Sequence, residues 1–155
     1  MPLRVRISVA AELRRPWARI GRNGPTMRRL LAAAVRAAFG ALRISDAELS
    51  LTLLDDAGIA DLNAAYLGHD GPTDVIAFAL YEPGETPVGD VYIGFDQALR
   101  QAERLGIPPD QELARLAIHG TLHVLGFDHP APAAARESSE MWQLQERILA
   151  GVLEP

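Results

Sequence analysis

Apolar and polar residues alternate in two segments of the chain, and a period of two is typical of half-buried β-strands. Residues 3–9 read LRVRISV and residues 47–54 read AELSLTLL. Two shorter apolar runs, DVIAFAL at 74–80 and DVYIGF at 90–95, follow the loop-forming segments GHDGP and EPGETPVG. These runs predict two further strands, of which the first is expected to be buried.

Apolar residues at helical spacing occupy most of the remaining chain. One helix is predicted to begin near Thr26, a candidate N-cap. Asp56 is the candidate cap of a second helix, which runs through DLNAAYL and ends at Gly68. Gly106 and the proline pair after it end a third helix, and Asp110 starts a fourth. Apart from the helix capped by Asp56, the predicted helices span residues 26–39, 96–105, 110–125 and 134–151.

The predicted elements follow the order β-α-β-α-β-β-α-α-α, which mixes hairpin and crossover connections. This order indicates an α+β fold in which a small mixed β-sheet carries helices on its surface. A length of 155 residues suits one domain, so residues 1–155 are expected to form a single unit. No run of eighteen uncharged apolar residues and no secretory signal occurs, and the protein is expected to be cytoplasmic.

Charge is distributed unevenly along the chain. Residues 1–43 hold ten of the fifteen basic residues, all of them arginine, and one acid, so this segment carries +9 in a chain of net charge −5. Guanidinium groups suit phosphate, which makes this segment a candidate RNA contact; an arginine-favouring coding bias explains the composition equally well. The candidate phosphate contacts are Arg4, Arg6, Arg14, Arg15, Arg19, Arg22, Arg28 and Arg29.

Three of the four histidines lie within HGTLHVLGFDH, residues 119–129. His119 and His123 are four residues apart and therefore share one face of the predicted helix. Gly126 can end that helix in a left-handed conformation and return the chain, which brings His129 toward the same ion. Three protein ligands and one open position are typical of catalytic zinc, and the absence of cysteine excludes thiolate ligands. Nickel fits these donors as well, with zinc the default.

One class of zinc peptidases has the same ligand spacing, but it carries a glutamate directly after the first histidine as general base. Gly120 occupies that position here. Without this glutamate no obvious residue can take a proton from zinc-bound water, so a peptidase is disfavoured. A glycine within an apolar helix also usually marks a close approach.

The motif HGTLHVLGFDH closely resembles the signature of YbeY-type endoribonucleases, a bacterial family of metal-dependent RNases. The resemblance extends to LNAAYLGHDGPTDVIAFAL at 62–80, GDVYIGFDQALRQAERLG at 89–106 and MWQLQERIL at 141–149. It implies a zincin-like α+β fold and one zinc ion bound by His119, His123 and His129. It also implies single-stranded RNA as substrate, a role in 16S rRNA 3′-end maturation and ribosome quality control, and the small ribosomal subunit or assembly proteins as partners.

Four further positions match the family pattern, namely Asn63, Tyr66, Thr73 and Asp74, and short polar residues there also suit a purely structural role in turns. Leu67 departs from the pattern, because the family has an arginine at this position that is thought to assist cleavage or phosphate contact. Either an arginine from the N-terminal segment replaces it, or His69 does, or catalysis is weak. The change to Ala77, where the family prefers serine, is minor.

The sequence leaves two alternatives for the nucleophile of the reaction. Either water or a ribose 2′-hydroxyl attacks phosphorus. Asp128 is the nearest carboxylate for proton transfer, and it can instead orient a ligating histidine. Three functions follow: a zinc endoribonuclease, which is favoured; a zinc-containing assembly or RNA-binding factor that cleaves weakly, supported by Leu67; and a zinc hydrolase of another substrate, disfavoured by Gly120.

Overall fold

The computed structural model describes residues 2–13, 24–127 and 139–154, and its elements follow the predicted order. Residues 128–138, which include Asp128 and His129, and residues 14–23, which include four of the candidate arginines, lie outside the described part. The elements are β1 (Leu3–Val9), α1 (Gly24–Ala41), β2 (Ala47–Leu54), α2 (Asp56–Leu67), β3 (Val75–Ala79), β4 (Val88–Gly94), α3 (Phe95–Leu105), α4 (Pro109–Val124) and α5 (Glu140–Leu153).

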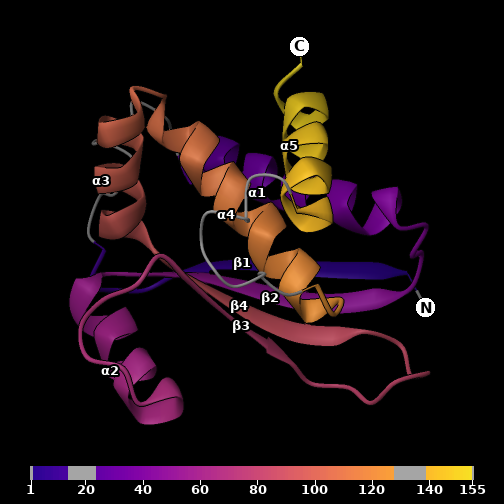
Figure 1. Ribbon diagram of the computed structural model, residues 1–155, viewed down its shortest axis with the longest axis horizontal. Coiled ribbons are helices and arrows are strands. Elements are labelled where there is room, and N and C mark those ends of the chain that lie inside the picture. Colours follow the sequence, from indigo (N-terminus) through magenta and orange to yellow (C-terminus); the bar gives the residue numbers. More distant parts are fainter. Residues whose placement is uncertain (1, 14–23, 128–138, 155) are drawn as a thin grey trace.

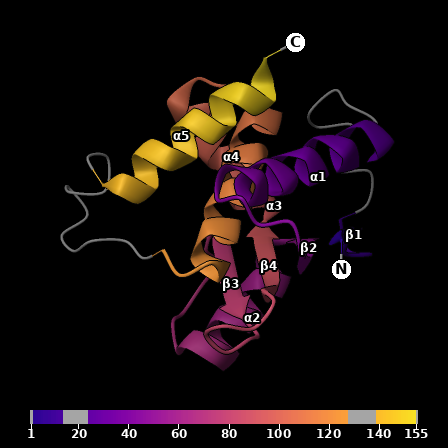
Figure 2. The same ribbon diagram turned by 90° about the vertical axis from the view of Figure 1, so that its right-hand side faces the viewer.

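The four strands form one mixed sheet in the order β1-β2-β4-β3. Strands β1, β2 and β4 are parallel, and β3 runs antiparallel to β4 at one edge. Helices α1, α3, α4 and α5 lie on one side of the sheet and α2 lies on the other (Figures 1 and 2). The predicted α+β fold with a small mixed sheet is confirmed.

The core lies between the sheet and the helices of the covered face. Along β2, Leu49, Leu51 and Leu53 are at most 1% exposed, and each is paired with an apolar residue of β1. The alternate residues Glu48 and Ser50 face the other side. This two-residue period confirms the predicted strands at 3–9 and 47–54. No helix in the described ranges is long and apolar enough to cross a membrane.

Several predicted helix boundaries are wrong by one or two residues. Asp55, not Asp56, caps α2: its Oδ1 accepts a hydrogen bond from the Gly58 amide at 2.8 Å. Helix α1 begins before Thr26 and α4 begins before Asp110. Both helices carry a proline in their first turn, where the fixed φ angle of proline suits a helix and its missing N–H costs nothing. Within the described residues the last helix begins at Glu140, and residues 134–138 of its predicted range lie outside the described part.

The apolar run at 74–80 forms β3, but the prediction that this strand is buried is wrong for most of it. Only Ile76 is buried, because β3 has one neighbouring strand and its other edge is unpaired within the described chain. Apolar composition alone does not distinguish a central strand from an edge strand that is covered by a helix. The edge position matters for the site, because α4 packs beside β3.

Helix α4 lies very close to the sheet at Gly120. A Cβ atom at this position would be 2.5 Å from Cγ1 of Val91 on β4 and 3.2 Å from Cγ2 of Val75 on β3. Both neighbours are β-branched and have few alternative rotamers, so a side chain at 120 would push the helix away from the sheet. The close approach that a glycine at this position predicts is confirmed.

We expect Gly120→Ala to lower the free energy of unfolding by about 1–2 kcal/mol. Overpacking costs about 1–3 kcal/mol, and the higher helix propensity of alanine offsets up to about 1 kcal/mol of it. Gly40→Ala in α1 is the matched control, because a Cβ there meets no atom within 4 Å. Urea unfolding should show Gly40→Ala equal to or more stable than the wild type; equal stability of both variants would contradict the packing argument.

Candidate metal centre

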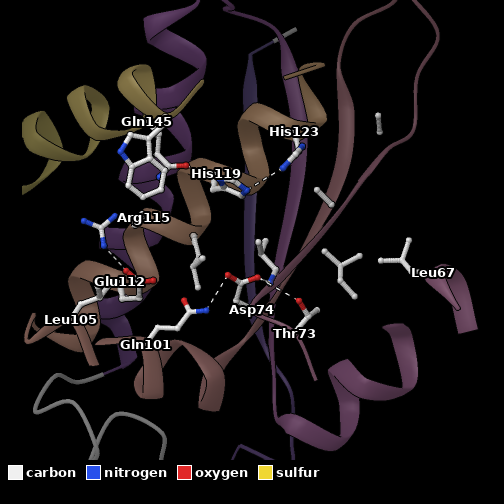
Figure 3. Close-up of a pocket in the computed structure, with 16 residues that line it drawn as sticks. Leu67, Thr73, Asp74, Gln101, Leu105, Glu112, Arg115, His119, His123 and Gln145 are labelled. Atoms are coloured by element: carbon white, nitrogen blue, oxygen red, sulfur yellow. Dashed lines mark hydrogen bonds and ion pairs between the residues drawn. The ribbon is translucent and has the colours of Figure 1, made fainter. Parts of the chain in front are cut away.

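Four polar side chains follow one face of α4 at spacings of three and four residues: Glu112, Arg115, His119 and His123. Residues at these spacings stack along a helix. Figure 3 shows all four on the side of α4 that faces β3 and α5. The sequence prediction that the two histidines share a face is confirmed.

The two imidazole rings have a geometry that suits a shared ion. The Nε2 atoms of His119 and His123 are 3.1 Å apart, and the ring centroids are 4.6 Å apart (Figure 3). Two nitrogens bound to one tetrahedral zinc at about 2.0–2.1 Å are about 3.3 Å apart. His119 is buried at 9% exposure and His123 is half-buried. The pair therefore fits two coordination positions of one metal ion.

The end of α4 directs the chain back after the second histidine. The Gly126 amide donates to the His123 carbonyl at 3.0 Å, and the Phe127 amide donates to the Leu122 carbonyl at 3.0 Å. Together with the positive φ of 101° at Gly126, these bonds form a Schellman motif. The predicted glycine stop is confirmed. His129 follows outside the described residues, and among the described ones no group of three metal-ligating side chains occurs.

A cavity of about 660 Å³ adjoins the histidine pair. The edge strand β3, the end of α2 and the helices α3, α4 and α5 form its walls (Figure 3). This volume is within the range of about 300–1,000 Å³ that is typical of small-molecule sites. Its described polar lining consists of Thr73, Asp74, Gln101, Glu112, Arg115, His119, His123 and Gln145.

Arg115 connects α4 to α5 through two carboxylates. Its Nε and Nη2 donate to Glu146 at 3.0 Å each, and its Nη1 donates to Glu112. Burial raises the pKa of Glu112, and the hydrogen bond and charge of Arg115 oppose this shift. Burial disfavours the charge on Arg115, yet its bonds to Glu146 and Glu112 leave the pKa of its guanidinium above the ordinary value. Arg115 is therefore a charged group that is held in place by two acids.

The residues that match the family pattern divide into two groups. Asn63 is buried and its amide donates to the Gly71 carbonyl at 3.0 Å, which is the structural role in a turn. Tyr66 is 68% exposed and its ring meets Phe78 edge-on at 5.6 Å.

Thr73 and Asp74 fix the entry into β3 and also line the cavity. Asp74 Oδ1 accepts from the Val75 amide at 2.8 Å, and Asp74 Oδ2 accepts from Gln101 at 3.1 Å. Leu67 lies at the end of α2, half exposed, and contributes to the cavity wall. Leu67, one of the two positions at which the chain departs from the family pattern, is therefore part of the candidate site.

The structure does not bring the described RNA-contact candidates to this cavity. Arg4 and Arg6 are exposed on β1, at the sheet edge opposite to β3. Arg28 donates to the Ile7 carbonyl at 2.7 Å, which ties α1 to β1, and Arg29 donates to Thr26. His69 is exposed just after α2. None of the five is among the described lining residues, so their contact with RNA stays a prediction.

Sequence reasoning missed the polar partners of the histidine pair. Gln145 Oε1 lies 2.6 Å from His119 Nδ1, Gln145 Nε2 donates to Glu146, and Arg115 in turn donates to Glu146. Helical spacing on α4 was a usable signal for Arg115, which precedes His119 by four residues. No local signal pairs Gln145 with His119, because the two residues are 26 positions apart in the chain and belong to different helices.

Comparisons with known proteins agree over most of the chain. A family model described as Endoribonuclease YbeY matches residues 20–152. An Endoribonuclease YbeY from Moorella thermoacetica is 45% identical over 138 residues, which cover 82% of this chain and 85% of the relative. Another from Frankia alni is 38% identical over 133 residues, covering 77% of this chain and 72% of the relative.

Among solved structures, the solution structure of TM1509 from Thermotoga maritima matches with a TM-score of 0.63 and 25% sequence identity. The match covers 96% of this chain and 88% of that chain. The fold, a mixed sheet with helices, thus agrees with the sequence matches on one class of α+β protein. The chain belongs to the Endoribonuclease YbeY family.

Proposed function

We propose that this protein is a cytoplasmic, zinc-dependent endoribonuclease that is specific for single-stranded RNA. In this proposal it acts in 16S rRNA 3′-end maturation and ribosome quality control, in contact with the small ribosomal subunit or its assembly proteins. The observation that carries the proposal is the His119–His123 pair, with Nε2 atoms 3.1 Å apart beside a cavity, in a chain of a family whose members are named endoribonucleases. The same placement of the pair at the end of α4 supports a zincin-like arrangement.

His119, His123 and His129 would hold the zinc ion. Bound zinc would supply Lewis acidity to a phosphoryl group and would lower the pKa of water at the site toward about 7. The protein side chains would hold and orient the ligands: Gln145 Oε1 lies 2.6 Å from His119 Nδ1, on the side of the ring away from Nε2. Asp128 is retained as the candidate for proton transfer or for orienting a ligand.

A peptidase-type general base has no space at the position after His119. A Cβ at Gly120 would lie 2.5 Å from Cγ1 of Val91 and 3.2 Å from Cγ2 of Val75, so the sheet leaves no room for a side chain. A glutamate there would displace α4. This packing disfavours a peptidase of that class.

A second candidate function is a zinc-containing ribosome-assembly or RNA-binding factor that cleaves weakly or not at all. Leu67 favours this alternative, because it lines the cavity at the position of the family arginine and offers no donor to phosphate. Among the described lining residues the arginine is Arg115, and two carboxylates already bind it.

Metal removal tests the proposal. Protein loaded with one zinc per chain is expected to cleave single-stranded rRNA internally, and chelation should abolish this cleavage because it removes the Lewis acid on which the proposed reaction depends. Addition of zinc after removal of the chelator should restore it, whereas magnesium should not, because imidazole ligands suit zinc and magnesium prefers oxygen. A base-paired RNA of the same sequence is the matched substrate control. RNA binding without cleavage by the zinc-loaded protein would favour the assembly factor instead.

A further inference from the structure

We propose that α5 is part of the metal centre, and that Gln145 is a positioning residue that fixes the ring tautomer and the orientation of His119. Glu146 and Arg115 fix Gln145 in turn. The inference rests on the metal site of the proposed function and names residues outside the histidine motif that set its geometry.

The orientation of the Gln145 amide follows from its two neighbours. Gln145 is 1% exposed, with its Nε2 3.1 Å from Glu146 Oε2 and its Oε1 2.6 Å from His119 Nδ1. A carboxylate can only accept a hydrogen bond, so the amide nitrogen must face Glu146 and the carbonyl oxygen must face the imidazole. That oxygen is also only an acceptor, and His119 Nδ1 must therefore carry the proton.

The consequence concerns the other nitrogen of the same ring. A neutral imidazole protonated on Nδ1 keeps the lone pair on Nε2, and in His119 this atom faces Nε2 of His123 at 3.1 Å. The ring is thus held in the tautomer that binds metal, with its donor atom aimed at the shared position. Ligating histidines generally have such a partner, and its loss typically lowers metal affinity about 10–100-fold.

Arg115 completes the arrangement by anchoring Glu146 to the helix that carries the histidines. Its Nε and Nη2 bind the two carboxylate oxygens of Glu146 at 3.0 Å each, a bidentate geometry that fixes the carboxylate plane. Because Arg115 and His119 both lie on α4, the contacts run from α4 to α5 and back. The docking of α5 on α4 therefore determines the state of a ligand on α4.

The test compares zinc affinity and tautomer in the wild type, Gln145→Leu and Gln145→Glu, with Gln143→Leu, an exposed position of the same helix, as the control. Competition with a chromophoric chelator should show Gln145→Leu binding zinc about 10–100-fold more weakly. Gln145→Glu keeps an acceptor for Nδ1–H but loses the donor to Glu146, so it should recover only part of that loss. The control should equal the wild type.

A second measurement is independent of zinc and of catalysis. In the metal-free wild type at mildly alkaline pH, nitrogen NMR of the imidazole should show His119 protonated on Nδ1 and not on Nε2, and Gln145→Leu should lose this preference. The inference is overturned if the wild type has the opposite tautomer, or if folded Gln145→Leu binds zinc as tightly as the wild type. If the wild type has the Nδ1–H tautomer but binds no zinc, the proposed metal site fails and the role of Gln145 in fixing the tautomer stands.

Discussion

Replacing His119 with alanine should abolish tight zinc binding and lower RNA cleavage by about 10³-fold or more. The variant removes one of two described nitrogens that are 3.1 Å apart and leaves the site short of a ligand. A catalytic metal ion lowers the activation free energy by several kcal/mol, and each 1.4 kcal/mol is a tenfold change in rate. Zinc content per chain and the initial rate of single-stranded RNA cleavage are the two measurements.

His69→Ala is the matched control for this experiment. His69 is an exposed histidine after α2 and is not among the described residues that line the cavity, so its loss should leave zinc content and cleavage unchanged. The control also tests whether His69 replaces the family arginine, since a large loss of cleavage with zinc content unchanged would assign it that role. Chelator-resistant cleavage by His119→Ala would contradict the metal mechanism altogether.

The fold was predictable to the extent that local patterns determine it. Strand β2 has a two-residue period because one face of it is buried, and Gly126 predicts the end of α4 because few other residues adopt a positive φ. The edge position of β3 was not predictable, because an edge strand that is covered by a helix has the same apolar composition as a central strand. The choice of Asp55 over Asp56 as cap depends on which carboxylate reaches the Gly58 amide.

The candidate site, like the fold, was predictable only where local patterns determine it. His119 and His123 share a helix, so their spacing predicts their proximity. Gln145 and Glu146 reach them only through the packing of α5 on α4, which no local pattern encodes. The strand order also separates Arg4 and Arg6 on β1 from the cavity beside β3, although the charge pattern alone suggested that they contribute to one RNA surface. Spatial relations between distant segments are the part that sequence patterns leave open.

Restoring an arginine at Leu67 should raise cleavage by about tenfold to a hundredfold. Leu67 is 48% exposed and lines the cavity, so a longer polar side chain has solvent and space available. A guanidinium there would offer a donor fork to phosphate, and one well-placed donor to a developing charge contributes about 10²–10³ in rate. We expect the gain mainly in kcat at saturating single-stranded RNA, with zinc content unchanged.

Leu153→Arg adds the same charge at an exposed position of α5 outside the described cavity lining, and it separates a local effect from general attraction of RNA. An equal gain in both variants would show that net charge, not the position of the arginine, limits the rate. If zinc-loaded wild type already cleaves and Leu67→Arg adds nothing, the family arginine is dispensable in this chain. If only Leu67→Arg cleaves, the wild type is an RNA-binding factor that lost activity at this position. The zinc ligands and the cavity would then suffice for cleavage once a side chain at position 67 donates hydrogen bonds to phosphate.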